Sequence, residues 1–476
     1  MNRNKIIKYI CAIISVTVYL IFIPFINFDS LEDGYRITVL LPLVFLLCFY
    51  LFLWEPLIKK RTPFIVLFSG VAFIRYVVLS IVTILNGTYW GLSKVPPSSE
   101  SLNLAGILMC WELLITSILI FYWSKKTIPD NYKKQKKVLE SQANPLIYLI
   151  FALVSVILIV LFPQARQGLS FFGEINRALN DEIGSPIILG IRECLINAKY
   201  FILFAFVIFL QKKFKGGFSK NSLFSYLFIL VISMVVIGIR IGTNRKKLLA
   251  DTFAILLFLW NLFPKYKRTT IFAITSIGVM LVVITTVSRG LHDSVNGFFV
   301  EYFDLDFLQT YFLGQYNVAI AIEAVNYFPS ALDIKTYLFG FLRPLFGIGA
   351  VVKNIDFSTV ADLFDTRMSM GLNGWRGDQI LPMIGEGYML FGLILAPIIS
   401  VMTVRLGIFF DSLYSKSKKI EIVFIASIVS FYLAQGMILN STIILNMLSF
   451  RLAIYMPVVY IAYASIKKYN SKGYHK

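Results

Sequence analysis

The amino-acid sequence predicts an all-α polytopic membrane protein. Of its 476 residues, 58% are hydrophobic and only 15% are charged, which is too little polar surface to cover a soluble protein of this size. The apolar residues also lie in continuous runs of roughly 18–25, the length of a helix that crosses the hydrocarbon core of a bilayer. A membrane β-barrel would instead show short segments of alternating polarity.

The chain contains twelve of these apolar runs, and the first begins close to the N-terminus. MNRNKIIKYICAIISV has the basic start of a secretory signal, but its apolar run is long and lacks a small-residue cleavage site, so we expect an uncleaved first span. No internal repeat is seen, so residues 1–476 are predicted to form a single integral membrane domain. The predicted spans cover residues 7–27, 35–54, 62–85, 101–123, 145–163, 186–210, 221–241, 245–263, 269–288, 379–404, 421–440 and 443–466.

The basic residues indicate which side of the membrane each connector faces. Lys and Arg number 45 against 26 Asp and Glu, a net charge of +19, but most lie in short connectors, as cytoplasmic anchors do, and no nucleic-acid partner is expected. With the N-terminus in the cytoplasm, alternate connectors hold most of these cations, and the C-terminus is cytoplasmic too. The predicted inner segments are residues 1–8, 55–61, 124–144, 211–220, 264–268, 405–420 and the C-terminal tail.

A long connector at 289–378 falls on the outer side of the membrane. At roughly 90 residues it is far above the usual loop length, so we expect it to be structured and functional. Within it, FDLDFLQTYFLGQYNVAIAIEAVNYF is predicted to form an amphipathic helix. TYLFGFLRPLFGIGAVV is apolar but short and interrupted by Pro344, which is typical of an interfacial or re-entrant segment rather than a span.

The turn between the seventh and eighth spans, GIRIGTNRKKLLADT, carries cations on the predicted outer side. We expect the seventh helix to end at Gly242 and Thr243 or Asn244 to cap the eighth. Three cations, Arg245 to Lys247, would then occupy the positive end of a helix dipole, an arrangement that a bound phosphate would complete. Alternatively, these cations contact lipid headgroups or pair with Asp251, four residues beyond Lys247.

Further cations lie near this turn or within the spans. The planar guanidinium fork of arginine suits bidentate contacts with phosphate. Arg75 in the third span and Glu112 in the fourth lie near mid-depth, where a lone charge is costly, and are predicted to pair. Span six carries Arg192, Glu193 and Lys199, and span twelve carries Arg451. The outer arginines are Arg166, Arg177, Arg289, Arg343, Arg367 and Arg376.

Few residues are candidates for acid–base chemistry. His292 follows the ninth span, whereas the other histidine, His475, lies in the C-terminal tail. Glu386 opens the tenth span, where a partly desolvated carboxylate can serve as a base, and Asp378 precedes it. Glu323 in the long loop is a weaker candidate. The four cysteines lie within spans without paired spacing, so neither a disulfide nor a metal site is predicted.

Three features together resemble the Wzy-type polymerases, also called O-antigen or oligosaccharide repeat-unit polymerases. They are the basic GTNRKKLLADT turn, the long late outer loop, and a span that opens with IGEGYMLFGLILAPII. The resemblance covers most of residues 140–465. Arg376 and Gly387 also fit an Arg-x10-Gly spacing found in some members, whereas the lysines of NRKKLL depart from the Gly-Arg-rich turn that members often carry.

The resemblance implies a GT-C-like glycosyltransferase of the bacterial plasma membrane that lengthens capsule or O-antigen chains. A growing glycan would pass from undecaprenyl pyrophosphate to a hydroxyl at the non-reducing end of a lipid-linked repeat unit, on the outer face and without a cofactor. The candidate protein partners are a chain-length regulator and a flippase of the same pathway.

In this scheme, fixed cations stabilise the negative charge that develops on the leaving pyrophosphate. His292 or Glu386 would deprotonate the attacking hydroxyl. The pyrophosphate-binding candidates are Arg240, Arg245, Lys246, Lys247, Arg289 and Arg376, and the secondary candidates are Arg192, Arg343, Arg367 and Asp378.

Three other functions use similar features. A flippase for the same lipid-linked oligosaccharide also needs many spans and cations, but transporters commonly contain repeated halves. An O-antigen ligase shares the outer-face chemistry and differs mainly in its acceptor. A membrane-bound acyltransferase would carry a histidine with a paired acid in or near a span, which this sequence lacks.

Overall fold

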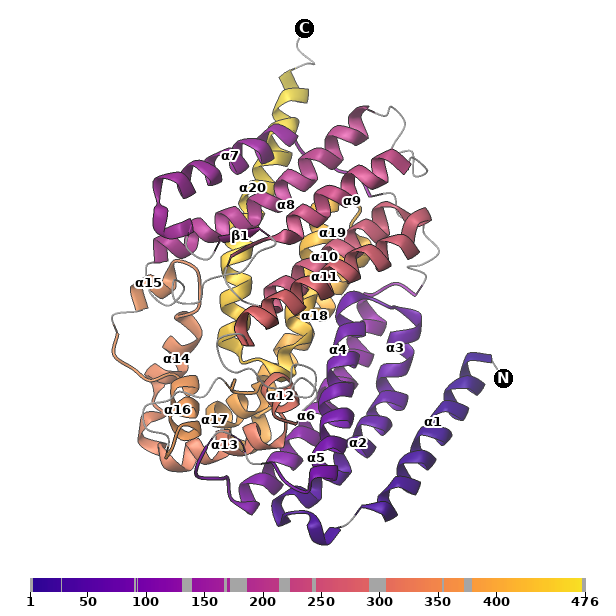
Figure 1. Ribbon diagram of the computed structural model, residues 1–476, viewed down its shortest axis with the longest axis vertical. Helices are drawn as coiled ribbons and strands as arrows, with labels where there is room; N and C mark the ends of the chain where they lie inside the picture. The colour runs from indigo at the N-terminus through magenta and orange to yellow at the C-terminus, as the bar shows by residue number, and fades with distance from the viewer. Residues whose placement is uncertain are drawn as a thin grey trace. The chain divides into compact units, whose positions relative to one another are not determined.

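A computed structural model shows the chain as a largely helical protein (Figure 1). The chain divides into two compact units. Unit 1 comprises residues 1–132, 297–415 and 430–446, and unit 2 comprises residues 133–296, 416–429 and 447–476. The structure describes residues 3–26, 28–89, 91, 93–130, 139–166, 169–171, 186–213, 223–241, 245–290, 305–352, 355–371 and 379–472.

The protein is an all-α polytopic membrane protein by the length and composition of its helices. Each of the twelve predicted spans contains helical residues, but within the described residues only eight helices are long and apolar enough to cross a membrane. These eight are Ile6–Phe25, Asp33–Lys59, Pro63–Asn86, Ser99–Thr127, Ile187–Lys213, Pro264–Thr285, Ile398–Lys416 and Ser441–Ile466.

The N-terminal part of unit 1 contains the first four of these helices, which Figure 1 draws in indigo and purple. Ser98 caps the fourth by accepting a hydrogen bond from the backbone N–H of Ser101, and Lys125 and Lys126 in its last turn complement the helix dipole. Two π-helical turns interrupt the second and third. The elements are α1 (Arg3–Phe22), α2 (Leu40–Cys48), η4 (Phe49–Leu53), α3 (Trp54–Lys59), α4 (Pro63–Phe73), η5 (Ile74–Val78), α5 (Leu79–Asn86) and α6 (Ser99–Thr127).

The long connector of unit 1 is helical, but the predicted amphipathic helix is divided into two helices. The chain breaks after α12 (Leu305–Phe312) at Leu313, whose φ of 49° is left-handed, and continues as α13 (Gln315–Tyr327). Residues 315–324 are all buried, because α13 packs against α6, α16 (Val360–Met368) and α17 (Met383–Leu395). The prediction holds for α12, in which Leu305 and Leu308 are buried and Asp306 is exposed, but not for α13, nearly all of whose side chains face protein.

The apolar segment around Pro344 forms two short helices, as its interruption indicated. α14 (Ile334–Leu342) and α15 (Ile348–Val352) are separated by a turn in which Gly347 has a φ of 81°. Such a positive φ favours glycine. No single helix covers residues 336–352, so this segment does not provide a continuous helical span.

The predicted tenth span, 379–404, is not one helix. α17 (Met383–Leu395) stops short of α18 (Ile398–Lys416), and Gly392 has a φ of 73° inside α17. A Cβ atom on Gly387 would lie 1.9 Å from the carbonyl oxygen of Ala396, which shows that the chain folds back on itself. Consequently residues 405–416, predicted as part of an inner connector, belong to α18.

Unit 2 contains helices and one two-stranded ribbon. The predicted seventh span ends early: α9 stops at Gly238, and β2 (Ile239–Ile241) pairs antiparallel with β1 (Leu169–Phe171). α7 packs along α8, and α10 along α11. The remaining bounds are α7 (Pro145–Leu161), α8 (Pro186–Lys213), α9 (Leu223–Gly238), α10 (Arg245–Leu262), α11 (Lys267–Gly290), α19 (Ile420–Ala434) and α20 (Ser441–Lys472). The last five residues of α19 and the first six of α20 belong to unit 1.

Candidate functional site

The ribbon of unit 2 places the first predicted cation inside the protein. Ile239, Arg240 and Ile241 alternate along β2, and successive side chains of a strand point to opposite faces. Arg240 pairs in register with Ser170 of β1 and is buried. Its guanidinium donates a hydrogen bond to the hydroxyl of Thr285 on α11. The ribbon therefore holds this arginine against a helix that follows it in the chain.

The cations at the start of α10 lie at the edge of the same unit. Arg245 and Lys246 are half-buried, and the ammonium of Lys247 lies 2.9 Å from a carboxylate oxygen of Glu193 on α8. The alternative pairing of Lys247 with Asp251 within α10 is therefore not the one observed. Gly242, Thr243 and Asn244, the predicted helix end and caps, lie outside the described residues.

Asp251 instead joins two cations from other helices. The ammonium of Lys199 on α8 lies 2.8 Å from one carboxylate oxygen, and Arg451 on α20 lies 3.6 Å from the other. The hydroxyl of Tyr200 also donates to Asp251. Lys199 donates a second hydrogen bond, of 3.0 Å, to the carbonyl oxygen of Ile239 in β2. The ion pairs are therefore connected directly to the ribbon.

We name this group the basic cluster. Among the described residues it contains four cations and two carboxylates, so its net charge is positive where most of its side chains are buried. Fixed cations in a largely buried region interact strongly with an anion, because little water screens them. Arg192 on α8 is also buried in unit 2. The members of the basic cluster are Arg240, Lys247, Lys199, Arg451, Glu193 and Asp251.

The structure does not test several of the predicted residues. His292, Arg376 and Asp378 lie outside the described residues, as does Arg177. Arg289 belongs to the last turns of α11 by its backbone. Arg166, a further outer candidate, donates hydrogen bonds of 3.1 Å to the carbonyl oxygens of Ile159 and Val160. It therefore satisfies acceptors at the C-terminal end of α7.

Glu386, the candidate base in unit 1, is buried at the start of α17. One carboxylate oxygen accepts a hydrogen bond of 2.6 Å from the backbone N–H of Ser441, and the other accepts one from the Ser441 hydroxyl. Ser441 is the first residue of α20, so the carboxylate also lies at the positive end of that helix dipole. This geometry joins α17 to the start of α20.

Arg367 and Glu323 form a buried pair in the long connector of unit 1. The Nε atom of Arg367 donates to Glu323 over 3.0 Å, and the other carboxylate oxygen accepts from the N–H of Ser98, 2.6 Å away. The pair thereby links α16, α13 and the start of α6. Arg343 is half-exposed and lies 4.0 Å from Asp362. These contacts give Arg367 and Glu323 a structural role, which is to join three helices of unit 1.

The predicted pairing of two charges within the spans is confirmed. The guanidinium of Arg75 lies 2.8 Å from Glu112, and neither side chain is exposed.

Sequence reasoning missed the β1–β2 ribbon and the partners of Lys247 and Asp251. The alternation of Ile239, Arg240 and Ile241 was the local signal for a strand, but three residues are too few to distinguish it from the end of an apolar helix.

No group of three or more metal-binding side chains occurs in the part of the chain that the structure describes. Comparisons with protein-family models, with curated proteins and with solved structures find no match. The basic cluster is therefore interpreted from its own chemistry: several fixed cations, arginines among them, in one partly dry region. Such a site can bind a phosphate or diphosphate group.

Proposed function

We propose that this chain is a polysaccharide polymerase of the bacterial plasma membrane. It transfers a growing glycan from undecaprenyl pyrophosphate to a hydroxyl at the non-reducing end of a lipid-linked repeat unit on the outer face. The observation that carries the proposal is the basic cluster, in which four cations and two carboxylates occupy a largely buried region. The two substrates carry the diphosphates that such a region suits.

The cations act on the leaving group. As the acceptor oxygen bonds to the anomeric carbon, the bond from that carbon to the phosphate oxygen breaks, and its electron pair stays on the diphosphate. Arg240 and Arg245 stabilise this growing charge, and their effect is strong because little water screens it. The hydroxyl proton passes to a base. We favour His292, because both oxygens of Glu386 already accept hydrogen bonds from Ser441.

Flippase activity is the second candidate, and one observation favours it. Lys199 lies near the middle of α8, a helix long enough to cross a membrane, and its partner Arg451 lies within α20. Charges deep in the membrane commonly mark a transport pathway.

An assay of the purified protein in liposomes with lipid-linked repeat units separates the two functions. Longer glycans identify a polymerase, whereas single units moved to the other leaflet identify a flippase.

Neutral variants test the role of one arginine of the basic cluster, Arg240, and of Arg245, which lies beside the cluster at the start of α10. We expect Arg240→Gln and Arg245→Gln each to slow chain growth by roughly 10²–10³-fold, the usual effect of losing one group that stabilises transition-state charge. Arg166→Gln is the matched control, since this arginine binds carbonyl oxygens at the end of α7. It should leave the rate within severalfold of wild type. The readout is glycan length per unit time, with membrane-inserted protein quantified in parallel.

Full activity in both variants would refute the assignment of these arginines. If repeat units change leaflets without lengthening, the polymerase proposal fails and the flippase takes its place. An O-antigen ligase would instead transfer the glycan to a lipid acceptor other than the repeat unit, and that product is distinguishable in the same assay.

A further inference from the structure

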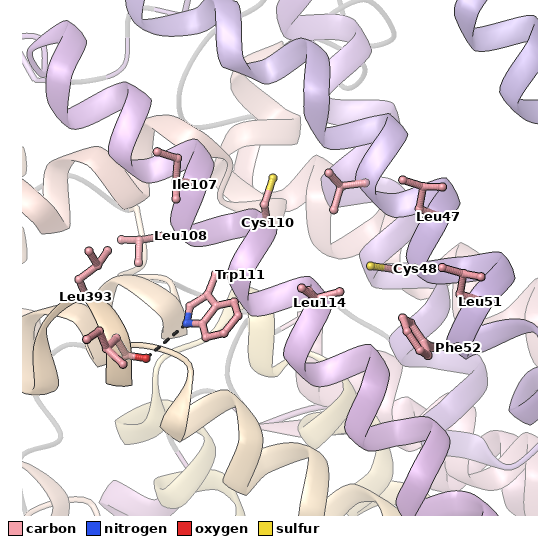
Figure 2. Close-up of a pocket in the computed structure, with 12 residues that line it drawn as sticks. Leu47, Cys48, Leu51, Phe52, Ile107, Leu108, Cys110, Trp111, Leu114 and Leu393 are labelled. Atoms are coloured by element: carbon pink, nitrogen blue, oxygen red, sulfur yellow. Dashed lines mark hydrogen bonds between the residues drawn. The ribbon is translucent and has the colours of Figure 1, made fainter.

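Unit 1 contains an apolar groove, separate from the basic cluster, between its second and fourth apolar helices. Its volume is about 640 Å³, within the range of sites that bind small molecules. Figure 2 shows Leu47 and Leu51 on one wall and Ile107, Trp111 and Leu114 on α6. The tip of the α17–α18 hairpin closes one end. Every side chain that lines the groove is apolar, apart from the indole N–H of Trp111 and two thiols.

The groove is a built feature, because a hydrogen bond fixes its end. The indole N–H of Trp111 donates to the carbonyl oxygen of Ile394, 3.3 Å away, which is the dashed line in Figure 2. Ile394 is 78% exposed and lies beyond Gly392, where the chain turns back. The bond gives the indole a polar partner while its ring remains in the groove, as a tryptophan in an apolar site requires.

What surrounds the groove follows from the helices that form it. Asp33–Lys59 and Ser99–Thr127 are both long and apolar enough to cross a membrane. Several groove side chains, Leu51 and Ile107 among them, are exposed at the surface of these helices. Hydrocarbon is the medium around such surfaces in a bilayer. The occupant with matching chemistry is therefore a hydrocarbon chain of a lipid.

The nearby ends of the same two helices supply a site for a headgroup. Lys59 at the end of α3 and Lys125 in the last turn of α6 lie close enough to Glu55 to interact with it electrostatically, and so does Lys8 of α1. Three cations thus gather around Glu55, and a second carboxylate nearby, Asp130, is paired with a fourth cation, Lys60. Tyr122, which is 64% exposed, belongs to the same turns of α6, and exposed tyrosines are typical of the membrane–water interface.

The spacing between groove and cations fits one leaflet. Lys59 follows Phe52 of the groove by seven residues, and Lys125 follows Leu114 by eleven. At about 1.5 Å per helical residue, these separations are about 10 Å and 16 Å. Half of a hydrocarbon core of about 30 Å is about 15 Å. A phospholipid whose phosphate lies at the lysines therefore reaches the groove with its acyl chain.

We propose that the groove binds one acyl chain of an anionic phospholipid, whose headgroup is held by Lys8, Lys59 and Lys125. The site is independent of the proposed polymerase activity. These lysines flank connectors that the charge distribution predicts to be cytoplasmic, whereas the glycan-carrying diphosphate is proposed to act at the outer face. The bound lipid fills the space between α2, α6 and the hairpin tip.

Trp111 provides the probe for a test. The full-length protein is placed in phosphatidylcholine nanodiscs in which a minor fraction of the lipid is dibrominated phosphatidylglycerol or dibrominated phosphatidylcholine. Bromine quenches indole fluorescence at short range, and Trp111→Phe identifies the contribution of Trp111 among the six tryptophans. We expect the anionic lipid to quench this contribution with about fivefold preference, the effect of one lysine at a membrane surface.

Two variants separate specific from general binding. Lys8→Gln combined with Lys125→Gln should bring the two lipids close to equal quenching, whereas Lys335→Gln, an exposed lysine on α14, should leave the preference unchanged. Native mass spectrometry of the wild-type protein gives a second measurement and should retain one phosphatidylglycerol, less often in the double variant.

Three outcomes would overturn the proposal. Equal quenching by the two lipids in the wild type means ordinary surrounding lipid. Absence of Trp111 quenching means that another surface, such as a second copy of the chain, covers the groove. Release of the brominated phosphatidylglycerol by equimolar polyprenyl phosphate assigns the groove to the substrate's carrier chain. None of these results depends on whether the chain polymerises glycans.

Discussion

The buried pair of Arg75 and Glu112 shows how one charge in a span is stabilised. Glu112 accepts hydrogen bonds from Arg75, from the hydroxyl of Tyr76 and from Ser400 of α18. The Nε atom of Arg75 donates to the carbonyl oxygen of Leu313, 3.0 Å away. Leu313 is the residue with the left-handed φ between α12 and α13. The pair therefore connects three spans to the strained junction of the long connector.

Removal of one member of this pair should be severe. We expect Arg75→Met to lower the free energy of unfolding by about 3–5 kcal/mol, because Glu112 would remain buried without its cation. Arg36→Met is the matched control, since Arg36 and Asp33 form an exposed pair and such pairs contribute at most about 1 kcal/mol. Unfolding by sodium dodecyl sulfate in mixed micelles measures both. Equal losses in the free energy of unfolding would show that the buried pair stabilises the protein no more than the exposed pair does.

Individual residues differ in how far sequence alone predicts their partners. Arg75 and Glu112 could be paired because two opposite charges near mid-depth have few other means of stabilisation. The partner of Glu386 could not be predicted, because Ser441 is a small polar residue with no charge, 55 positions further along the chain. Lys247 has two acidic candidates, and the nearer one in sequence, Asp251, was already engaged by Lys199 and Arg451.

At the scale of elements, length and hydropathy predicted where helices occur but not where they break. Residues 379–404 are apolar almost throughout, so one span was expected. The break depends on Gly392, which adopts a conformation open mainly to glycine, and on Gly387, against which the backbone of Ala396 packs. Glycines also occur within intact helices, so their presence alone does not locate a turn.

Two glycine substitutions test this account of the hairpin. We expect Gly392→Ala to lower the free energy of unfolding by about 1–3 kcal/mol through backbone strain. Apart from the adjoining backbone, no heavy atom lies within 4 Å of the added methyl group, so no collision with another part of the protein contributes. Gly340→Ala, in α14 and with equally open space around it, should instead raise stability by about 0.5–1 kcal/mol. Effects of the same sign would argue against a strained turn at Gly392.

The β1–β2 ribbon was beyond sequence prediction for a different reason. Each strand has three residues, and the register joins Ser170 to Arg240, seventy positions apart. An apolar run that continues into a strand looks like the last turn of a helix. The cations at residues 240–247 were nevertheless visible in the sequence. The structure adds the partners that join Arg240 and Lys247 to the basic cluster.

At the scale of the whole molecule, the distribution of charge predicts the sidedness on which the polymerase proposal depends. Both the turn at residues 240–247 and the connectors 124–144 and 211–220 are rich in cations, so cation content alone does not separate the two sides. Alternation of the spans does. Only eight of the described helices are long and apolar enough to cross a membrane, and the tenth predicted span is divided between α17 and α18, so the alternation of twelve spans stays a prediction.

Thiol labelling of intact cells measures this sidedness. In a chain whose four cysteines are replaced by serine or alanine, we expect Arg245→Cys to react with a membrane-impermeant maleimide added from outside. Lys418→Cys, in a predicted inner connector and exposed, should react only after the cells are opened. The reverse pattern would place the basic cluster's turn in the cytoplasm and remove the basis for chemistry on the outer face.

The interleaving of the two units has a consequence for how the protein is made. Unit 1 begins at the N-terminus yet requires residues 430–446, so it stays incomplete until nearly the whole polypeptide has left the ribosome. From the synthesis of Glu386 until that of Ser441, 55 residues later, this carboxylate lacks the residue whose N–H and hydroxyl satisfy it. A buried carboxylate without hydrogen-bond partners is costly, so unit 1 should be unstable in that state. Truncated products ending before residue 441 should accordingly be short-lived in cells.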